Sequence, residues 1–203
     1  MTPFRLPFVA LFVALAGLLA AACLPVTTTS PIGTTAGLGA DPALDGAWKA
    51  APQADDKGPN YMHFLVDAQG GMTVLLVSHA RGKGASDWSE YRVTAATLNG
   101  HHYLNALTLR ENGKASSDTT ATHNTPLLYT LSADGRTLSL FLIDDAAAKA
   151  AIKAGKLQGT VEPGDYGDVV LTAAPDKLDA YFARDEAVAL FGTKPLVVLE
   201  RLE

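Results

Sequence analysis

Short runs of alternating apolar and polar residues, separated by turn dipeptides, occupy most of the chain from residue 42 onward. Leucine at every second position within 137–143 predicts a strand with one buried face. Glycine-containing dipeptides divide three pairs of such runs and favour tight turns between antiparallel strands. We therefore expect three β-hairpins, namely 61–67 with 72–79 around Gly70-Gly71, 91–98 with 102–110 around Asn99-Gly100, and 127–131 with 137–143 around Asp134-Gly135.

Two stretches near the C-terminus have helical rather than alternating patterns. Asp144-Asp145 precedes the alanine-rich run 146–154, and Gly155 follows it, as at the N-cap and C-terminus of a helix. From Pro175 to about Phe191 the apolar residues recur at roughly helical spacing. Strands at 168–172 and 196–202 complete the pattern. The sequence predicts a mainly β fold: an antiparallel meander of about eight strands forming a closed or half-open barrel, with two helices covering an end. A sandwich is the alternative.

Residues 1–22 have the pattern of a secretory signal peptide. A short segment with the single positive charge Arg5 precedes the uncharged apolar run 6–22, which ends in three alanines. The segment Leu19-Ala20-Ala21-Ala22-Cys23 resembles the lipobox of bacterial lipoproteins. This resemblance implies diacylglycerol on Cys23, cleavage before it and, because Leu24 rather than aspartate follows, sorting to the outer membrane facing the periplasm. An uncleaved anchor helix and cleavage that leaves a free thiol are the alternatives.

The segment after the cysteine has no charge up to residue 40 and is rich in Thr, Ser, Gly, Pro and Ala. Such composition is typical of a flexible linker, because it offers little apolar surface to bury. We therefore expect three parts: a signal peptide (1–22), a lipidated cysteine with a flexible tether (23–41), and a single β-barrel-like domain (42–203).

Two residues at opposite ends of this domain carry a second resemblance. Gly46-Ala47-Trp48 begins the first expected strand of the domain, and Arg201 lies in the last one. The arrangement resembles the lipocalin-like (calycin) barrels, which implies that the arginine packs over the indole as a structural pair. The domain as a whole also resembles uncharacterised small proteobacterial lipoproteins, which agrees with an envelope location.

Charge and cysteine content exclude several classes of protein. The formal net charge is −5, and the Lys and Arg residues are scattered without a basic stripe, so nucleic acid is not an expected partner. Cys23 is the single cysteine, which excludes an internal disulfide framework and a thiolate metal site.

No residue pattern predicts a catalytic or metal site. Adjacent strand residues point to opposite faces, so His101 and His102 cannot form one compact site. A two-histidine site from His63 and His79 across the first hairpin is the metal arrangement worth testing, although partly exposed strand histidines are the simpler interpretation. The remaining candidates are solvated or chance neighbours: His123, Ser78-His79, Ser86-Asp87, the carboxylates Glu162, Asp165 and Asp168, and the loop Gly82-Lys83-Gly84, which lacks a phosphate-binding pattern.

The strand 71–77 is apolar on both faces, which favours one face packed under the helices and the other lining a barrel lumen. The leading hypothesis is a non-enzymatic, lipid-anchored envelope protein that binds a small hydrophobic ligand and needs no cofactor. The alternative is a structural or interaction lipoprotein with a filled barrel that docks an envelope protein. An enzyme is the third interpretation, and it would require a cleft that gathers His or carboxylate groups.

Overall fold

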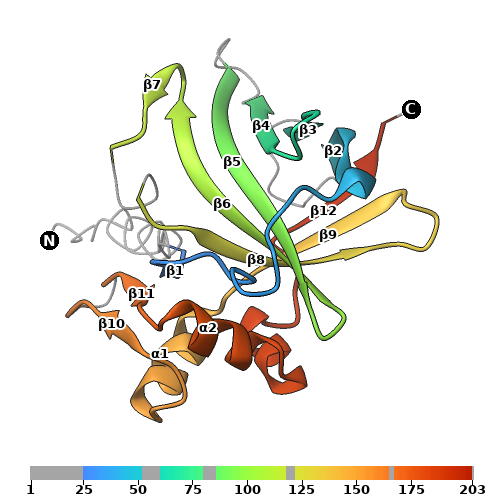
Figure 1. Ribbon diagram of the computed structural model, residues 1–203. Coiled ribbons are helices and arrows are strands. Elements are labelled where there is room, and N and C mark those ends of the chain that lie inside the picture. The colour runs from blue at the N-terminus through green and yellow to red at the C-terminus, as the bar shows by residue number, and fades with distance from the viewer. Residues whose placement is uncertain (1–24, 52–59, 80–85, 118–121, 165–166, 203) are drawn as a thin grey trace, which may run out of the picture.

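The computed structural model describes residues 25–51, 60–79, 86–117, 122–164 and 167–202. Its central feature is a closed antiparallel barrel of eight strands in simple up-and-down order (Figure 1). The last strand pairs with both the first strand and the preceding one, which closes the ring. The strands are β2 (Gly46–Ala50), β3 (Asn60–Val66), β4 (Met72–His79), β5 (Ser86–Leu98), β6 (His101–Glu111), β8 (Thr125–Leu131), β9 (Thr137–Leu142) and β12 (Val197–Arg201).

The three predicted hairpins are confirmed. β3 pairs with β4, β5 with β6, and β8 with β9, each in antiparallel register. At the β5–β6 turn both Asn99 and Gly100 have positive φ, the conformation that an Asn-Gly turn provides at low cost. A two-residue strand, β7 (Lys114–Ala115), folds back on the end of β6.

An insertion between β9 and β12 forms a second layer. It contains α1 (Asp145–Lys153), β10 (Gly159–Val161), β11 (Val169–Leu171), α2 (Pro175–Phe182) and the 3₁₀ helix η3 (Asp185–Phe191). The first predicted helix is confirmed as α1, whose N-cap Asp144 accepts a hydrogen bond from the Ala147 N–H at 2.8 Å. The second predicted helix is two elements, because Arg184 is extended and redirects the chain. That break lets Phe191 return to Phe182, with 6.0 Å between their ring centroids.

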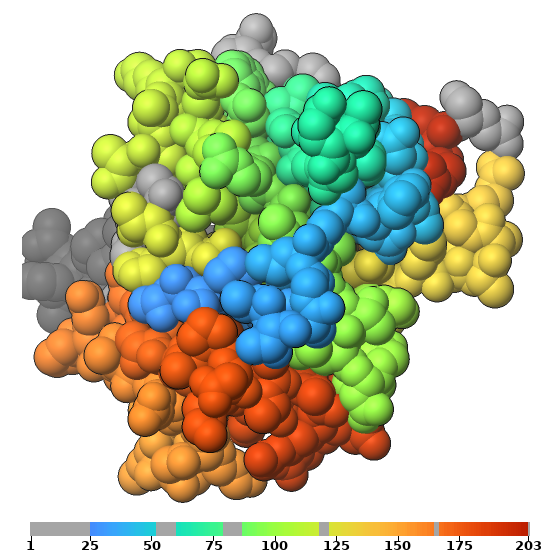
Figure 2. All heavy atoms as spheres, in the orientation of Figure 1, coloured from blue at the N-terminus to red at the C-terminus, as the bar shows by residue number. Residues whose placement is uncertain are grey.

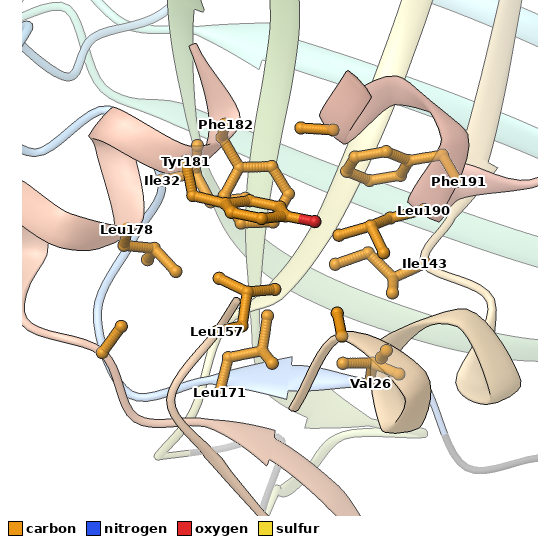
Figure 3. Packing of buried hydrophobic residues seen from close by; sticks show 14 of the residues in the cluster. Val26, Ile32, Ile143, Leu157, Leu171, Leu178, Tyr181, Phe182, Leu190 and Phe191 are labelled. Carbon is orange, nitrogen blue, oxygen red and sulfur yellow. The ribbon is translucent and has the colours of Figure 1, made fainter. Parts of the chain in front are cut away.

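The helices cover the outer wall of the barrel rather than an end, which corrects the expectation. Residues of β5, β6 and β8 that point away from the lumen pack against α1, α2 and η3 in one cluster. Figure 3 shows side chains that other parts of the chain contribute to this cluster, among them Ile32, Phe182 and Phe191. Tyr103 of β6 lies at its centre, donates a hydrogen bond to the Phe182 carbonyl at 2.8 Å, and contacts the Phe182 and Phe191 rings. A second cluster fills part of the barrel interior.

The expectation of a flexible tether is wrong for residues 25–40. β1 (Thr27–Thr28) pairs in parallel with β11, and Val26 and Ile32 are buried between the barrel and the helices. Figure 2 shows this segment, in blue, lying along the boundary between the two layers. The composition was a poor guide to this segment, because backbone hydrogen bonds and only a small number of apolar side chains are enough to anchor it. Gly33 shows how close the fit is, since a Cβ there would lie 2.1 Å from that of Ala96.

Candidate functional site in the barrel lumen

Alternation along the strands divides the barrel wall into an inner and an outer face. On β6, Leu104 belongs to the interior cluster and Tyr103 to the cluster under the helices. The same alternation separates Tyr129 from Leu128 on β8. Inward-facing side chains from all eight strands therefore meet in one lumen.

One end of the lumen, which we call the Trp48 end, is filled. Trp48 is fully buried, packs edge-to-face on Phe64 with 6.4 Å between ring centroids, and donates from its indole N–H to the Leu44 carbonyl at 2.9 Å. Leu138 and Leu199 are 0% and 1% exposed beside it. These side chains belong to one buried cluster at this end.

Arg201 fixes the chain across the Trp48 end. Its guanidinium carbon lies 4.2 Å from the Trp48 ring centroid, which confirms the predicted pair. The same guanidinium donates to the Gly135 carbonyl at 3.0 Å and to the carbonyls of Ala43, inside η1 (Pro42–Leu44), and of Asp45, the residue after it. One side chain thus joins the first and last strands of the barrel to the segment before them.

The chain segment before η1 also crosses this end. Gly39 and Ala95 exchange two backbone hydrogen bonds, of 3.1 and 2.6 Å. The Tyr129 hydroxyl donates to an Asp41 carboxylate oxygen at 2.7 Å. Burial raises the pKa of Tyr129 above its ordinary value, and the adjacent Asp41 carboxylate raises it further. The tyrosine therefore remains a neutral donor across the physiological pH range.

The opposite end of the lumen, which we call the Glu111 end, is hollow. It holds a cavity of about 320 Å³, at the lower limit of small-molecule sites. Its wall is almost entirely apolar. The described residues that line it are Pro25, Met62, Phe64, Val74, Leu76, Tyr91, Val93, Leu104, Ala106, Thr108, Glu111, Thr125, Leu127, Leu140, Leu142 and Leu196.

Four polar side chains line this cavity: Tyr91, Thr108, Glu111 and Thr125. Tyr91 and Thr108 are direct cross-strand partners on β5 and β6, and Thr125 lies at the start of the neighbouring β8. Within the part of the chain that the structure describes, none of the four side chains has a hydrogen-bond or ion-pair partner. An apolar cavity with a few such groups is the usual arrangement of a ligand site.

A β-bulge places Glu111, an exposed residue, at the rim of the cavity. Glu90 pairs with Arg110 while the next residue, Tyr91, pairs with Thr108, so Leu109 is an extra residue on β6. Regular alternation would give Thr108 and Arg110 the same face, but the bulge reverses the order. Arg110 instead forms an ion pair with Glu90 at 2.9 Å, and Glu111 lines the lumen.

The structure does not bring the histidines together. His63 pairs with Leu75, and His79 pairs with Ser86, so the two histidines are not neighbours across the hairpin and the conceivable two-histidine site is not formed. The hairpin turns over 67–71, which sets position 76 rather than 79 opposite Met62. The His79 side chain lies outside the described residues.

The other two strand histidines point to opposite faces of β6, as expected. His101 lies 3.1 Å from an Asp185 carboxylate oxygen, whereas His102 contacts the Thr97 hydroxyl at 2.9 Å and the Tyr129 ring. His123 lies outside β6, just before β8, and its Nδ1 is buried without a hydrogen-bond partner in the described structure.

The remaining candidate residues form no common site. Ser78 lines a separate hollow at the rim, and Asp87 accepts a hydrogen bond from the Asn112 amide at 3.2 Å. The Glu162 N–H donates to the Asp168 carbonyl at 2.9 Å, closing a turn. Asp165, the loop residues Gly82, Lys83 and Gly84, Cys23 and the side chain of Ser86 lie outside the described residues. Among the residues that are described, no group of three or more His, Cys, Asp or Glu could hold a metal ion.

Sequence analysis missed the four polar residues of the cavity. Tyr91 and Thr108 fall in predicted strands, and their shared inner face could have been found by extending the period-two pattern from the Asn99-Gly100 turn. Glu111 could not be assigned this way, because strict alternation from Thr108 gives it the outer face. No local sequence signal marks the bulge at Leu109.

Across the described ranges, no helix is both long and apolar enough to cross a membrane. Comparison of the chain with protein-family models, with curated proteins and with solved structures found no significant match.

Proposed function

We propose that this protein is a lipid-anchored envelope protein, lipocalin-like in build, whose barrel lumen binds a small hydrophobic molecule. The observation that carries the proposal is the apolar cavity of about 320 Å³ at the Glu111 end. Burying an apolar ligand there contributes about 25 cal/mol for each Å² removed from water. The hollow favours this function over a structural lipoprotein with a filled barrel, because only the Trp48 end is filled.

The proposal predicts that narrowing the cavity abolishes ligand binding. Ala106 lines the lumen, and its chain neighbour Leu107 is on the outer face. We expect Ala106→Phe to weaken binding of an uncharged naphthalene-based fluorophore at least about tenfold, because the added ring occupies the ligand's space. Fluorescence titration of the chain from position 23 onward, carrying Cys23→Ser so that no acyl chain competes, measures this.

Leu107→Phe is the matched control, since it adds a ring one residue away on the opposite face. It should leave the dissociation constant within about twofold of the parent value. Thermal unfolding of both variants checks that the barrel is intact, because added volume in a packed region costs about 1–3 kcal/mol. The proposal fails if the parent protein shows no saturable fluorescence change, or if both variants bind equally.

The packed N-terminal segment sets a short distance between the proposed lipid anchor and the cavity. Pro25 lines the cavity, and Val26 is 2% exposed. Pro25 is two positions after Cys23, a distance of at most about 7 Å along the chain. A diacylglycerol group on Cys23 would therefore place the membrane surface close to the Glu111 end rather than at the end of a long tether. A ligand could then pass between the bilayer and the lumen over a short path.

Intact-mass analysis of membrane-fraction protein tests the anchor. We expect a chain that begins at Cys23 and carries the added mass of diacylglycerol, and we expect Cys23→Ser to abolish both the added mass and membrane attachment. A parent protein that is cut after Ala22, unmodified and released from the membrane would refute the anchor. That result would leave the ligand-binding proposal unaffected, since the cavity belongs to residues 25–202.

A further inference from the structure

The charge on the wall of the lumen bears on the chemical class of the ligand. Glu111 is the one charged residue among the described residues that line the cavity, and no Lys, Arg or His lines it. A ligand with a carboxylate or phosphate would meet a like charge at Glu111 and no counter-charge among the described residues that line the cavity. Like charges brought together are unfavourable, although the exposure of Glu111 to water keeps this repulsion modest.

The positions of these groups define which part of a ligand they can reach. Phe64, Leu104 and Leu140 form the apolar inner part of the cavity, toward the Trp48 end. Tyr91 and Thr108 face each other across β5 and β6, and Glu111 follows them on the same face beyond the bulge. Thr125 joins them from β8. An amphiphile would therefore place its apolar part inward and its head group among three hydroxyls and a carboxylate.

Among the described residues, no neighbouring cation forms an ion pair with the Glu111 carboxylate. Arg110 is held by Glu90 on the outer face, and Asp87 is a further acidic group near this end. Lys114 is the cross-strand partner of Glu111 on β7, but in the described structure its ammonium forms no ion pair. Both side chains are exposed at the rim, but only Glu111 lines the cavity, so the ligand's head group meets Glu111 first.

We infer that the lumen prefers an amphiphile with a protonated amine head group and a single apolar chain or ring over the corresponding carboxylic acid. This inference rests on the proposed ligand-binding function and names the ligand class. A hydroxyl head group is intermediate, because it can hydrogen-bond to Tyr91, Thr108 and Thr125 but gains no charge interaction. The volume of the cavity suits one chain rather than a two-chain lipid.

Competition among matched ligands tests the inference. Dodecylamine, dodecanol and dodecanoic acid have the same alkyl chain length and differ in their head groups. Each is titrated against the uncharged fluorophore bound to the Cys23→Ser chain at pH 7 and low salt, and displacement of the fluorophore is measured. We expect the amine to bind about fivefold more tightly than the alcohol, the scale of a partly exposed ion pair, and the acid to bind most weakly. Raising the salt concentration should reduce the difference between amine and acid.

Two variants assign the preference to Glu111. Glu111→Gln keeps the size of the side chain and should abolish the preference for the amine while leaving dodecanol affinity within about twofold. Lys114→Gln, the control on the same hairpin, should retain the order of affinities. The inference is overturned if the acid binds as tightly as the amine, or if Glu111→Gln leaves the preference unchanged, even though the fluorophore binds. If the fluorophore does not bind the parent protein at all, the proposed function itself is refuted together with the inference.

Discussion

Replacing Trp48 with alanine is expected to lower the free energy of unfolding by about 3–5 kcal/mol, the range for removing a buried aromatic side chain. The indole is fully buried, contacts Phe64, bonds to the Leu44 carbonyl and lies under Arg201. Its loss leaves a void at the filled end and removes the aromatic partner of a guanidinium. Urea unfolding followed by circular dichroism measures the change. Domains are typically stable by about 5–15 kcal/mol. The alanine variant therefore stays folded enough for this measurement only if the parent protein lies in the upper part of that range.

A double-mutant cycle separates the pair from the packing. Trp48→Phe is used where the alanine variant does not fold, and Arg201→Lys keeps the charge while losing the planar fork that reaches three backbone carbonyls. We expect a coupling energy of about 0.5–2 kcal/mol between Trp48 and Arg201. Strictly additive losses would show that the guanidinium and the indole do not stabilise each other.

Replacing Asp179 with alanine should have the second largest effect, a loss of about 2–4 kcal/mol. This carboxylate, on α2, is 4% exposed and accepts hydrogen bonds from the Gly33 N–H at 2.6 Å, the Thr35 N–H at 2.7 Å and the Thr35 hydroxyl at 2.6 Å. It is the main polar connection between the N-terminal segment and the helices. Without the Asp179 carboxylate, the Gly33 N–H, the Thr35 N–H and the Thr35 hydroxyl have no acceptor at the boundary between the N-terminal segment and α2. Chemical denaturation gives the energy, and hydrogen exchange at Gly33 and Thr35 gives its location.

The neighbouring Asp176 provides the control for Asp179. It lies one turn earlier on the same helix and forms a 3.6 Å ion pair with Lys177 between exposed side chains. Asp176→Ala should therefore change stability by less than about 1 kcal/mol. Equal losses of stability in the two variants, or unchanged hydrogen exchange at Gly33 in Asp179→Ala, would mean that the Asp179 carboxylate does not hold the N-terminal segment in place.

The hairpins and the barrel followed from local patterns, and the reason is physical. A strand with one face toward a core must alternate, and Asn99-Gly100 fixes a tight turn at the residues where the pattern changes direction. α1 was equally readable from Asp144 and the alanines that follow it. These features depend on residues that are close in sequence, so the order of side chains is sufficient to find them.

The N-terminal segment and the helix ending at Phe191 were misjudged, because distant residues decide both. Residues 25–40 have a composition typical of linkers, but Asp179 and Asn105 supply hydrogen-bond partners for Gly33 and Ile32 across long stretches of chain. Phe191 leaves the helical path to pack on Phe182 and Tyr103. Tertiary contacts outweighed local preference at both places.

The sequence by itself determined the alternation, the turns and the approximate number of barrel strands, whereas the pairing of Trp48 with Arg201 was expected from the resemblance to calycin barrels. Only the tertiary structure decided how much of the lumen the inward side chains fill, because that depends on how side chains from eight strands interdigitate around a closed ring. It also decided that Glu111 rather than Arg110 lines the cavity. A single extra residue in β6 reverses the faces of everything after it, and a bulge is a property of the paired strands rather than of either sequence alone.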